Sequence, residues 1–490
     1  MLMLTRRSAV ASMAAFVAAL RGQAKDTRTA LAATEAPILY QPTWPSLRRH
    51  RNPQWLSDAK LGIYTHWGPL RGSDLHDWRP DKFDPEGWAD LIKSAGAKFA
   101  GPVSEHGAQV AMWDSNLTEL TVVKQGPKRD VMGEMREALR KRGIRFLASF
   151  HAFGANERRL ARGGKVREVV DKYQPDVIYF DLGVGGSLGA RNSGSYIGGK
   201  KLSGKDNVYT GEPESDRKEF LAYYFNQADK YGNEVQVFSK EYDFSPGVGM
   251  RDVEDGREPQ LAFDEWVTDI DIASSESGDH GLASPWFYSE SIKYKSPHSL
   301  ICELVDATAK NGRILLNVGP KPDGSFSNEA IERLAAIGDW LKVNGEAIHG
   351  TSPWVIYGEG PTDLRSIDLF DYYFHGSHSM WDLLNLMKAG VVQYGHYSQI
   401  YVVPYKPEDV RFTIKGDSLF AICLGWPGKA ATFQSLGSGA LLKFGEISSI
   451  RMLGLDRDLD YTHTESALKI DTPPERPCEH AYTFKILRKV

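Results

Sequence analysis

The chain has 490 residues, of which 41% are hydrophobic and 25% are charged, with 47 glycines and 25 prolines. This composition is typical of a globular protein and excludes collagen-like, coiled-coil and largely disordered chains. The net charge is -4 and no segment forms a basic block. We therefore predict that the protein does not bind nucleic acid.

Residues 1–33 are predicted to be a signal peptide of the bacterial twin-arginine type. Arg6 and Arg7 precede an apolar run over 9–20, and a charged region followed by an apolar one is typical of export signals. The alternative to a removed signal is an N-terminal membrane anchor. The apolar run argues against an anchor, because it is shorter than the roughly 20 residues that cross a bilayer. We expect a periplasmic or secreted protein with no membrane span once the signal is removed.

From about residue 55 to 350, short apolar runs alternate with amphipathic stretches, which is the pattern of repeated β/α units. The expected strands are Leu61–Thr65, Lys98–Val103, Arg145–Phe150, Asp176–Phe180, Glu234–Phe238 and Arg313–Val318. The expected helices are Pro85–Ala95, Val131–Arg142, Val166–Tyr173, Asp216–Tyr231 and Pro297–Lys310. This number of units favours an α/β fold with a (β/α)8-like barrel over a doubly wound sheet.

The sequence changes in character after Trp354. Short alternating runs separated by Gly, Pro and Asp replace the β/α pattern, which is typical of small antiparallel sheets. We therefore expect a barrel domain at 34–354, a connector at 355–405 and a C-terminal antiparallel β-sandwich at 406–490.

Two carboxylates follow strand regions, at the end of a parallel barrel where active-site groups gather. Asp181 closes the run 176–181 before a glycine-rich loop, and Glu254 lies beyond the next strand region. Two carboxylates about 5 Å apart would support glycoside hydrolysis with retention of configuration. The alternatives are that Asp181 caps a turn and that Glu254, among other acidic residues, belongs to a solvated surface.

His66 and His106 also follow successive strands, so both would point into the same cleft. A single histidine is more often structural than functional. The sequence contains no His-Glu-x-x-His, paired-cysteine or Asp-rich calcium pattern. We therefore predict neither a metal ion nor another cofactor.

Three other motif matches are weaker. Ser187 lies in a Gly-x-Ser-x-Gly match over 185–189, but the segment after it is a poor helix, which a nucleophile elbow requires. Ser57 and Lys60 match Ser-x-x-Lys without the companion Lys-Thr-Gly. A dinucleotide fingerprint fails because Leu188 stands in place of its third glycine. These matches are weak, but the Ser187 match keeps a serine hydrolase as an alternative.

Six groups of residues, taken in order, form a recognisable pattern. They are Trp55–Gly68, Phe83–Trp88 with Ala95–Phe99, Met112–Ser115, Pro175–Asp181, Gly312–Gly324 and Asn344–Ile348. Together they resemble the α-L-fucosidase family of glycoside hydrolases, the retaining family 29 type, in a divergent form. Residues 412–490 resemble the C-terminal β-sandwich of that family.

The resemblance implies an exo-glycosidase that hydrolyses terminal α-L-fucosyl linkages of oligosaccharides or glycoconjugates through a covalent glycosyl-enzyme. It implies Asp181 as the nucleophile and Glu254 as the general acid/base. A carbohydrate is then the expected partner, whereas the sequence gives no oligomeric state. The resemblance also implies a set of sugar-binding side chains, namely His66, His106, Asp77, Trp78, Tyr179 and Trp286.

The sequence departs from the family pattern at three places. Gly107 follows His106 where the family has a second histidine, Phe287 replaces the glycine of a Trp-Gly-Tyr motif, and the segment between Trp67 and Phe83 is shorter than usual. The missing histidine and the short segment remove groups from the sugar pocket and spare the two carboxylates. An altered sugar specificity, or a non-catalytic carbohydrate-binding protein on the same scaffold, is therefore the alternative hypothesis.

Overall fold

The chain divides into two compact units, 1–39 and 40–490, and all elements below belong to the second. The expected signal peptide at 1–33, the Ser187 motif and Glu254 lie outside the residues that the computed structural model describes. The described residues are 39–151, 159–181, 184, 196–197, 200–201, 212–240, 244–253, 258, 260–273, 286–362, 405–440 and 445–489.

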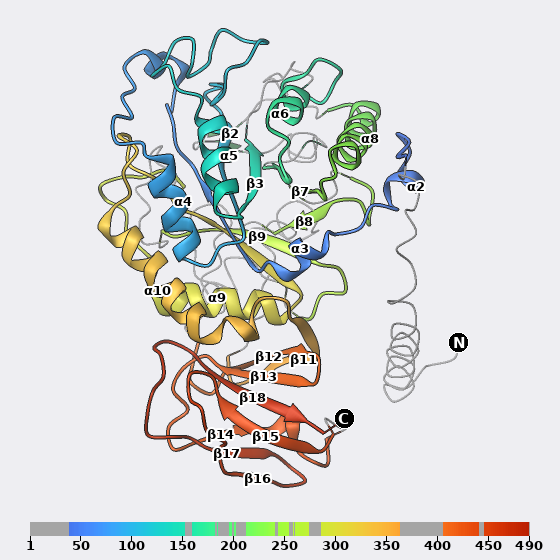
Figure 1. The fold of residues 1–490 in the computed structure, drawn as a ribbon, viewed down its shortest axis with the longest axis vertical. Coiled ribbons are helices and arrows are strands. Elements are labelled where there is room, and N and C mark those ends of the chain that lie inside the picture. Colours follow the sequence, from blue (N-terminus) through green and yellow to red (C-terminus); the bar gives the residue numbers. More distant parts are fainter. Residues whose placement is uncertain are drawn as a thin grey trace. The chain divides into compact units, whose positions relative to one another are not determined.

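Eight parallel strands form a closed barrel in the order β1-β10-β9-β8-β7-β4-β3-β2 (Figure 1). Strand β1 pairs with β2 on one side and with β10 on the other, which closes the sheet. This confirms the predicted barrel. The strands are β1 Leu61–Thr65, β2 Phe99–Glu105, β3 Arg145–Phe150, β4 Val177–Phe180, β7 Gln236–Lys240, β8 Met250–Asp252, β9 Trp266–Asp271 and β10 Gly312–Asn317.

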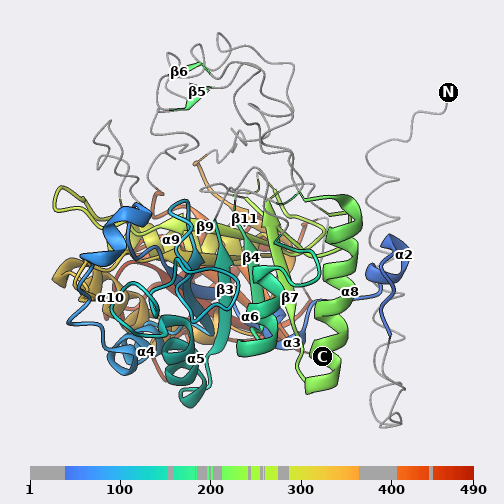
Figure 2. The same ribbon diagram turned by 90° about the horizontal axis from the view of Figure 1, so that it is seen from above.

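Helices follow six of these strands. Figure 2 shows α5, α6 and α8 side by side along the outside of the barrel. Within the described part of the chain, no helix separates β7, β8 and β9. The helices are α4 Pro85–Ser94, α5 Val131–Lys141, α6 Lys165–Tyr173, α8 Glu214–Tyr231, α9 Pro297–Ala309 and α10 Asn328–Asn344.

Local sequence explains where several helices begin. The side chains of Asp84, Asp130 and Ser327 each accept a hydrogen bond from a backbone N–H in the first turn of α4, α5 and α10. Such N-caps satisfy amides that the helix itself leaves without partners. Gly143 follows α5 with φ at 71°, the left-handed conformation that glycine adopts without strain at helix ends.

Strands β8 and β9 were not predicted, for two physical reasons. β8 has only three residues, which is too short for a periodic signal. β9 carries buried acids, Asp269 and Asp271, so it does not read as an apolar run. Hydrogen bonds from other strands offset the cost of removing these acids from water. The Tyr64 hydroxyl, for example, donates to Asp269 Oδ2 at 3.1 Å.

The lower interior of the barrel is a packed apolar layer. A Cβ on Gly62 would lie 2.2 Å from the Phe99 ring, so glycine in β1 leaves the space that this ring fills. Barrel cores of this kind hold side chains and leave no open channel. The layer includes Phe99, Leu147, Val177, Phe238, Met250, Val267 and Leu315.

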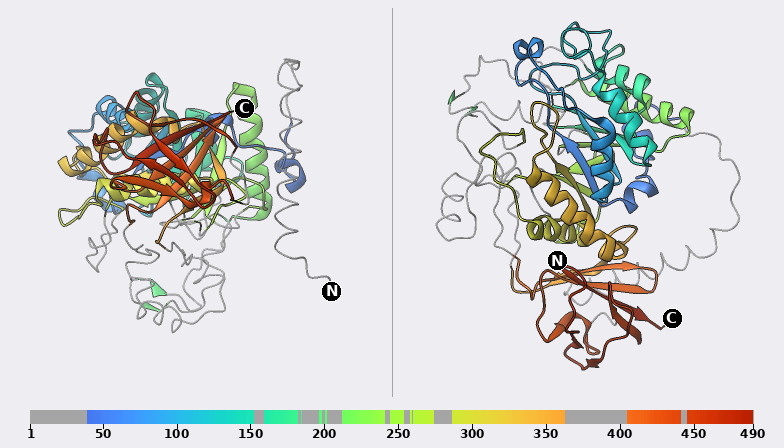
Figure 3. Two further views of the ribbon diagram at one scale, coloured as in Figure 1. Left: turned by 90° about the horizontal axis from the view of Figure 1, so that it is seen from below. Right: turned by 60° about the vertical axis from the view of Figure 1, so that its left-hand side comes forward.

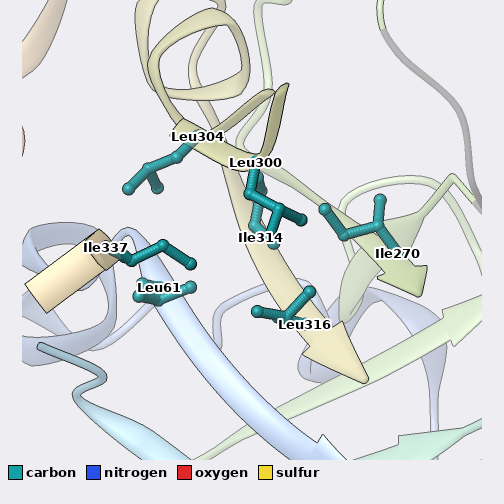
Figure 4. Close-up of a pocket in the computed structure, with 7 residues that line it drawn as sticks. All are labelled: Leu61, Ile270, Leu300, Leu304, Ile314, Leu316 and Ile337. Atoms are coloured by element: carbon teal, nitrogen blue, oxygen red, sulfur yellow. The ribbon is translucent and has the colours of Figure 1, made fainter. Parts of the chain in front are cut away.

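A second apolar layer lies between the strands and the helices. Figure 4 shows a small pocket in this layer, between β1, β9 and β10 on one side and α9 and α10 on the other. All its lining side chains are aliphatic, so it offers no side-chain hydrogen bond to a sugar. The seven residues are Leu61, Ile270, Leu300, Leu304, Ile314, Leu316 and Ile337.

Three tryptophans join the segments that follow the first and last strands of the barrel. Trp67, Trp78 and Trp88 donate their indole N–H groups to the carbonyl oxygens of residues 321, 322 and 324, at 2.8, 3.1 and 2.8 Å. We call this contact the tryptophan seam. It fixes the loop after β10 against the segment after β1, because each bond satisfies a buried or half-buried donor.

The C-terminal part consists of two antiparallel sheets, as predicted (Figure 3). Side chains of both sheets share one core, in which the Phe433 ring lies 6.2 Å from Phe412 and 5.8 Å from Phe484. One sheet has the order β11-β12-β13-β18-β15 and the other β14-β17-β16. The strands are β11 Ser352–Glu359, β12 Val410–Lys415, β13 Ser418–Cys423, β14 Ala430–Phe433, β15 Ile447–Met452, β16 Tyr461–His463, β17 Leu468–Asp471 and β18 Tyr482–Arg488.

The larger sheet begins before residue 406. Residues 355–359, which the sequence assigns to the connector, belong to β11, and Gly358 and Glu359 among them pair with β12. Trp354 holds this strand in place because its ring packs 5.3 Å from Phe412. Among the described helices, none has the length and apolar character needed to cross a membrane.

Candidate active site

The carboxyl ends of neighbouring barrel strands bring together five polar residues, which we call the mouth cluster. His66, His106, His151 and Asp181 directly follow β1, β2, β3 and β4, and Asn317 is the last residue of β10. Parallel strands end at the same rim of a barrel, so residues far apart in sequence meet there. His66 and His151 are buried and His106 is half-buried.

A hydrogen-bonded chain fixes the orientation of His66. Asn317 donates its amide nitrogen to the Trp286 carbonyl at 2.7 Å and to Asp271 Oδ1 at 3.2 Å. Its amide oxygen therefore faces His66 Nδ1, at 3.0 Å, and His66 donates through this nitrogen. The other ring nitrogen, Nε2, is then the acceptor and lies 3.1 Å from His151 Nδ1.

His151 lies against Asp181. Its Nδ1 is 2.6 Å from Asp181 Oδ2, and its Nε2 is 2.5 Å from Ser149 Oγ. A carboxylate only accepts hydrogen bonds, so Nδ1 carries a proton, and in the tautomer with this single proton Nε2 accepts from the Ser149 hydroxyl. The His151 side chain is 1% exposed, whereas the Asp181 side chain is 10% exposed. The carboxylate is thus anchored from below and accessible from the barrel mouth.

Two histidines of the cluster are uncharged at neutral pH. Burial, with a smaller contribution from the neighbouring His151, lowers the pKa of His106 to about 3 in spite of the opposing effect of Asp181. Burial also lowers the pKa of His66 well below its usual value, with His151 and His106 acting in the same direction. A neutral imidazole has one donor and one acceptor, which suits it to binding sugar hydroxyl groups.

Aromatic rings flank the histidines. The Trp286 ring centroid lies 5.5 Å from that of His66, and the Phe287 ring lies 5.5 Å from His66 and 5.0 Å from His106. Trp286 and Phe287 are half-buried. They supply the kind of apolar surface that small-molecule sites place beside a few polar groups.

The structure places Tyr179 beneath the cluster and not on an accessible wall. Its side chain is fully buried, and its hydroxyl donates to Asp252 Oδ2 at 2.9 Å. Burial raises the pKa of Tyr179 well above its usual value, as do Asp181 and Asp252 nearby. Tyr179 therefore supports the cluster from inside the barrel.

Asp77 and Trp78 also lie differently from the expectation. Asp77 is exposed just after a short 3-10 helix, Gly72–His76. Trp78 is buried in the tryptophan seam, with its ring 4.7 Å from that of Trp67. Among the contacts of the described residues, none joins these two side chains to the mouth cluster. A sequence pattern does not reveal this, because the position of the segment depends on packing against the loop after β10.

Glu254, the expected acid/base, lies outside the described residues, two positions beyond the end of β8 at Asp252. Sequence reasoning missed three members of the site: His151, Asn317 and Phe287. A signal for His151 was available, because it follows the run Arg145–Phe150 just as His66 and His106 follow theirs.

The three histidines could also present ligands to a metal ion. His66, His106 and His151 each offer one nitrogen, and these atoms lie within 4.8 Å of one another. No motif spacing reveals the group, because each histidine follows a different strand. Asn317 and Asp181, as acceptors, and the Ser149 hydroxyl already lie against nitrogens of His66 and His151.

A closed parallel barrel with a carboxylate and histidines at its carboxyl end has the architecture of a barrel enzyme. Comparison with known families gives its class. The family model "Alpha-L-fucosidase" matches residues 27–75 and 72–346, and "Alpha-L-fucosidase C-terminal domain" matches 405–487. The chain therefore belongs to the α-L-fucosidase family and is a glycoside hydrolase.

Relatives match over almost the whole chain. Tissue alpha-L-fucosidase of Homo sapiens is 27% identical over 531 residues, covering 95% of this chain and 94% of the relative. The Bos taurus protein of the same name is 25% identical over 527 residues, covering 92% of each.

Solved structures share the fold. A Thermotoga maritima alpha-fucosidase in complex with fucose has a TM-score of 0.64 and 22% identity, covering 91% of this chain and 100% of that one. A family 29 alpha-L-fucosidase from Bacteroides thetaiotaomicron, solved as a trapped covalent intermediate, has a TM-score of 0.59 and 17% identity, covering 89% and 96%.

Proposed function

We propose that the protein is a retaining exo-hydrolase of terminal α-L-fucosyl linkages, with Asp181 as its nucleophile and Glu254 as its general acid/base. The observation that carries this proposal is the position of Asp181. Its carboxylate lies at the carboxyl end of β4, is 10% exposed, and is held by an imidazole through one oxygen. Such a carboxylate is anchored and still within reach of a substrate.

The reaction has two steps. Asp181 attacks the anomeric carbon of the fucosyl residue, while Glu254 protonates the departing glycosidic oxygen. This gives a fucosyl ester of Asp181 and a free aglycone. Glu254, now ionised, removes a proton from water, which attacks the same carbon and releases fucose and the Asp181 carboxylate. Two inversions leave the anomeric configuration unchanged.

The neutral imidazoles of His66 and His106 suit the hydroxyl groups of the sugar, since each has a donor and an acceptor. Trp286 and Phe287 would receive its apolar face and methyl group. The relatives named alpha-L-fucosidase, and the similar structures solved with fucose or as a covalent intermediate, support this substrate and mechanism.

The first experiment is to measure release of 4-nitrophenol from 4-nitrophenyl α-L-fucoside by the purified protein and by Asp181→Ala. We expect turnover by the wild type and its loss in the variant. Circular dichroism should show that both proteins are folded. Proton NMR of the fresh product should show α-fucose before it mutarotates.

Formation of β-fucose would overturn the retaining mechanism, and full activity of Asp181→Ala would overturn the nucleophile assignment. Absence of turnover by the folded wild type would favour the alternative, an altered sugar specificity or a carbohydrate-binding protein. A panel of other 4-nitrophenyl glycosides and calorimetric titration with fucose would then distinguish these two.

We further propose that residues 1–33 direct export by the twin-arginine route and are removed, which places the protein in the periplasm or outside the cell. Arg6 and Arg7 before the apolar run support this proposal. Replacing both by lysine should retain the full-length precursor in the cytoplasm of a bacterial host. Export of the double variant at the normal rate would contradict the assignment.

A further inference from the structure

The contacts of His151 are not explained by sugar binding. Its side chain is 1% exposed, and the family resemblance assigns it no role. It stands at the end of β3, with its ring centroid 4.5 Å from that of His66 and 5.4 Å from that of His106. A buried polar residue beside a candidate nucleophile calls for a functional account.

We propose that His151 is a positioning residue that holds the nucleophile Asp181 through a hydrogen bond from Nδ1 to Oδ2. The proposal rests on the proposed function of Asp181 and adds the group that orients it. The distance between these two atoms is 2.6 Å, within the range of a charge-assisted hydrogen bond.

The neighbours of His151 fix the direction of this bond. His66 donates through Nδ1 to Asn317, so its Nε2 presents a lone pair toward His151 Nδ1. Asp181 Oδ2 is also an acceptor, so a single N–H on His151 Nδ1 faces two acceptors. The Ser149 hydroxyl satisfies Nε2 from the opposite side.

Both nitrogens of His151 thus have partners in the protein, which favours positioning over a contact with the sugar. Gly107 provides a useful contrast. It is exposed, and a Cβ added there would meet no atom within 4 Å. Gly107 stands where the family has a second histidine, and in this chain the third imidazole of the cluster is that of His151, which directly follows β3.

The bond has a defined consequence for both steps. With Oδ2 held by His151, the proposal assigns attack to Oδ1, and the hydrogen bond limits rotation of the carboxylate before the reaction. A hydrogen bond to a carboxylate is stronger than one to an ester carbonyl. His151 should therefore favour departure of Asp181 when water cleaves the fucosyl ester.

Three substitutions separate positioning from simple packing. Asn places its amide nitrogen close to where Nδ1 of His lies, Gln places it close to Nε2, and Leu has no donor. We expect His151→Leu and His151→Gln to lower kcat on 4-nitrophenyl α-L-fucoside by about 100-fold, the cost of a misplaced reacting group. His151→Asn should recover most of that loss.

Two further readouts would not respond to a merely structural role. Slow breakdown of the ester should give His151→Leu a burst of 4-nitrophenol equal to the enzyme concentration, with a KM lower than that of the wild type. Loss of a hydrogen-bond donor to Asp181 should raise the pKa of this carboxyl group. The acidic limb of the pH profile of kcat/KM of His151→Leu should therefore move to higher pH. His463→Leu, an exposed position in the C-terminal sheets, is the matched control and should change neither.

Equal losses in the Asn, Gln and Leu variants, with no burst and no shift of the acidic limb, would overturn the proposal. A proton NMR experiment tests the contact without activity. The wild type should show a strongly downfield Nδ1 proton from His151 that disappears in Asp181→Ala and in His151→Gln, and its absence from the wild type would also overturn the proposal. A wild type that shows this proton but hydrolyses no fucoside would contradict the proposed function and leave the contact established.

Discussion

Two buried polar clusters in the protein differ in a way that separates stability from function. The mouth cluster lies at the carboxyl ends of the barrel strands. The second, which we call the Asp306 cluster, consists of Asp306, Lys310 and Arg411. Asp306 Oδ2 lies 2.9 Å from Lys310 Nζ, and its Oδ1 lies 2.6 Å from Arg411 Nε. All three side chains are at most 3% exposed.

The surroundings of the two aspartates explain the difference. Each oxygen of Asp306 meets a cation, and the cluster ties α9 to β12. Asp181 Oδ2 meets an imidazole, and the side chain keeps 10% exposure. A buried carboxylate surrounded by cations is a structural tie, whereas one that keeps access to solvent at a barrel rim is a candidate for chemistry. Burial of charge alone does not identify an active site.

The largest expected effect is on catalysis at the mouth cluster. Asp181→Gly should lower kcat/KM by about 10³ to 10⁵-fold, because it removes the proposed nucleophile. Azide should restore part of the rate by entering the space that the side chain leaves, with fucosyl azide as the product. Thermal unfolding should stay close to that of the wild type. An unaffected rate, or a loss of rate explained by unfolding, would contradict the distinction between a functional Asp181 and a structural Asp306.

The Asp306 cluster should respond in the opposite sense. Asp306→Ala leaves Lys310 and Arg411 as buried cations, and breaking such a pair costs about 3–5 kcal/mol of the free energy of unfolding. Activity per folded molecule should stay close to that of the wild type. Chemical denaturation measures the loss, with Asp339→Ala as the control. Asp339 pairs with Lys342 on the surface, where a pair contributes about 0.2–1 kcal/mol.

The stability of the mouth cluster should depend on pH. The folded-state pKa of His106 is about 3 and that of His66 is also lowered, so the unfolded chain binds more protons between pH 3 and 6.5. The stability that they contribute is fully present above pH 6.5 and falls as the pH drops, by up to about 1.4 kcal/mol per pH unit and histidine. Two neighbours act on His106 in opposite directions, since His151 lowers its pKa and Asp181 raises it.

His106→Gln tests this dependence because it removes one titrating group from the cluster. Urea unfolding at pH 7 and pH 4.5 should show a smaller loss of stability on acidification for the variant than for the wild type. An equal loss in both proteins would mean that His106 does not titrate as its burial requires.

The smallest effect should come from the aromatic wall. Phe287→Ala removes a ring that contacts His66 and His106, and we expect KM for 4-nitrophenyl α-L-fucoside to rise about tenfold, in line with the contribution of one aromatic contact. Initial rates at varied substrate concentration measure this change. An unchanged KM would place the sugar elsewhere at the mouth.

The sequence supported the prediction of much of the barrel, because the first four strands and the last are apolar runs that end in polar residues. The rule that active groups follow such runs led to His66, His106 and Asp181. The rule also applied to His151, which we overlooked because no motif contains it. Tyr179 and Trp78 could not be placed in this way, because their burial depends on partners more than 70 residues away in the chain.

The tryptophan seam has a consequence for the kinetics of folding. Its three hydrogen bonds join residues separated by 236 to 254 positions in the chain, and contacts of such long range slow folding because a large loop must close first. The barrel closes by pairing of β10 with β1, so it cannot close until β10 has been synthesised. Until then β1 presents an edge with no strand beside it, a state prone to association with other chains. The indole rings at this junction would report the final closing step through their fluorescence during refolding.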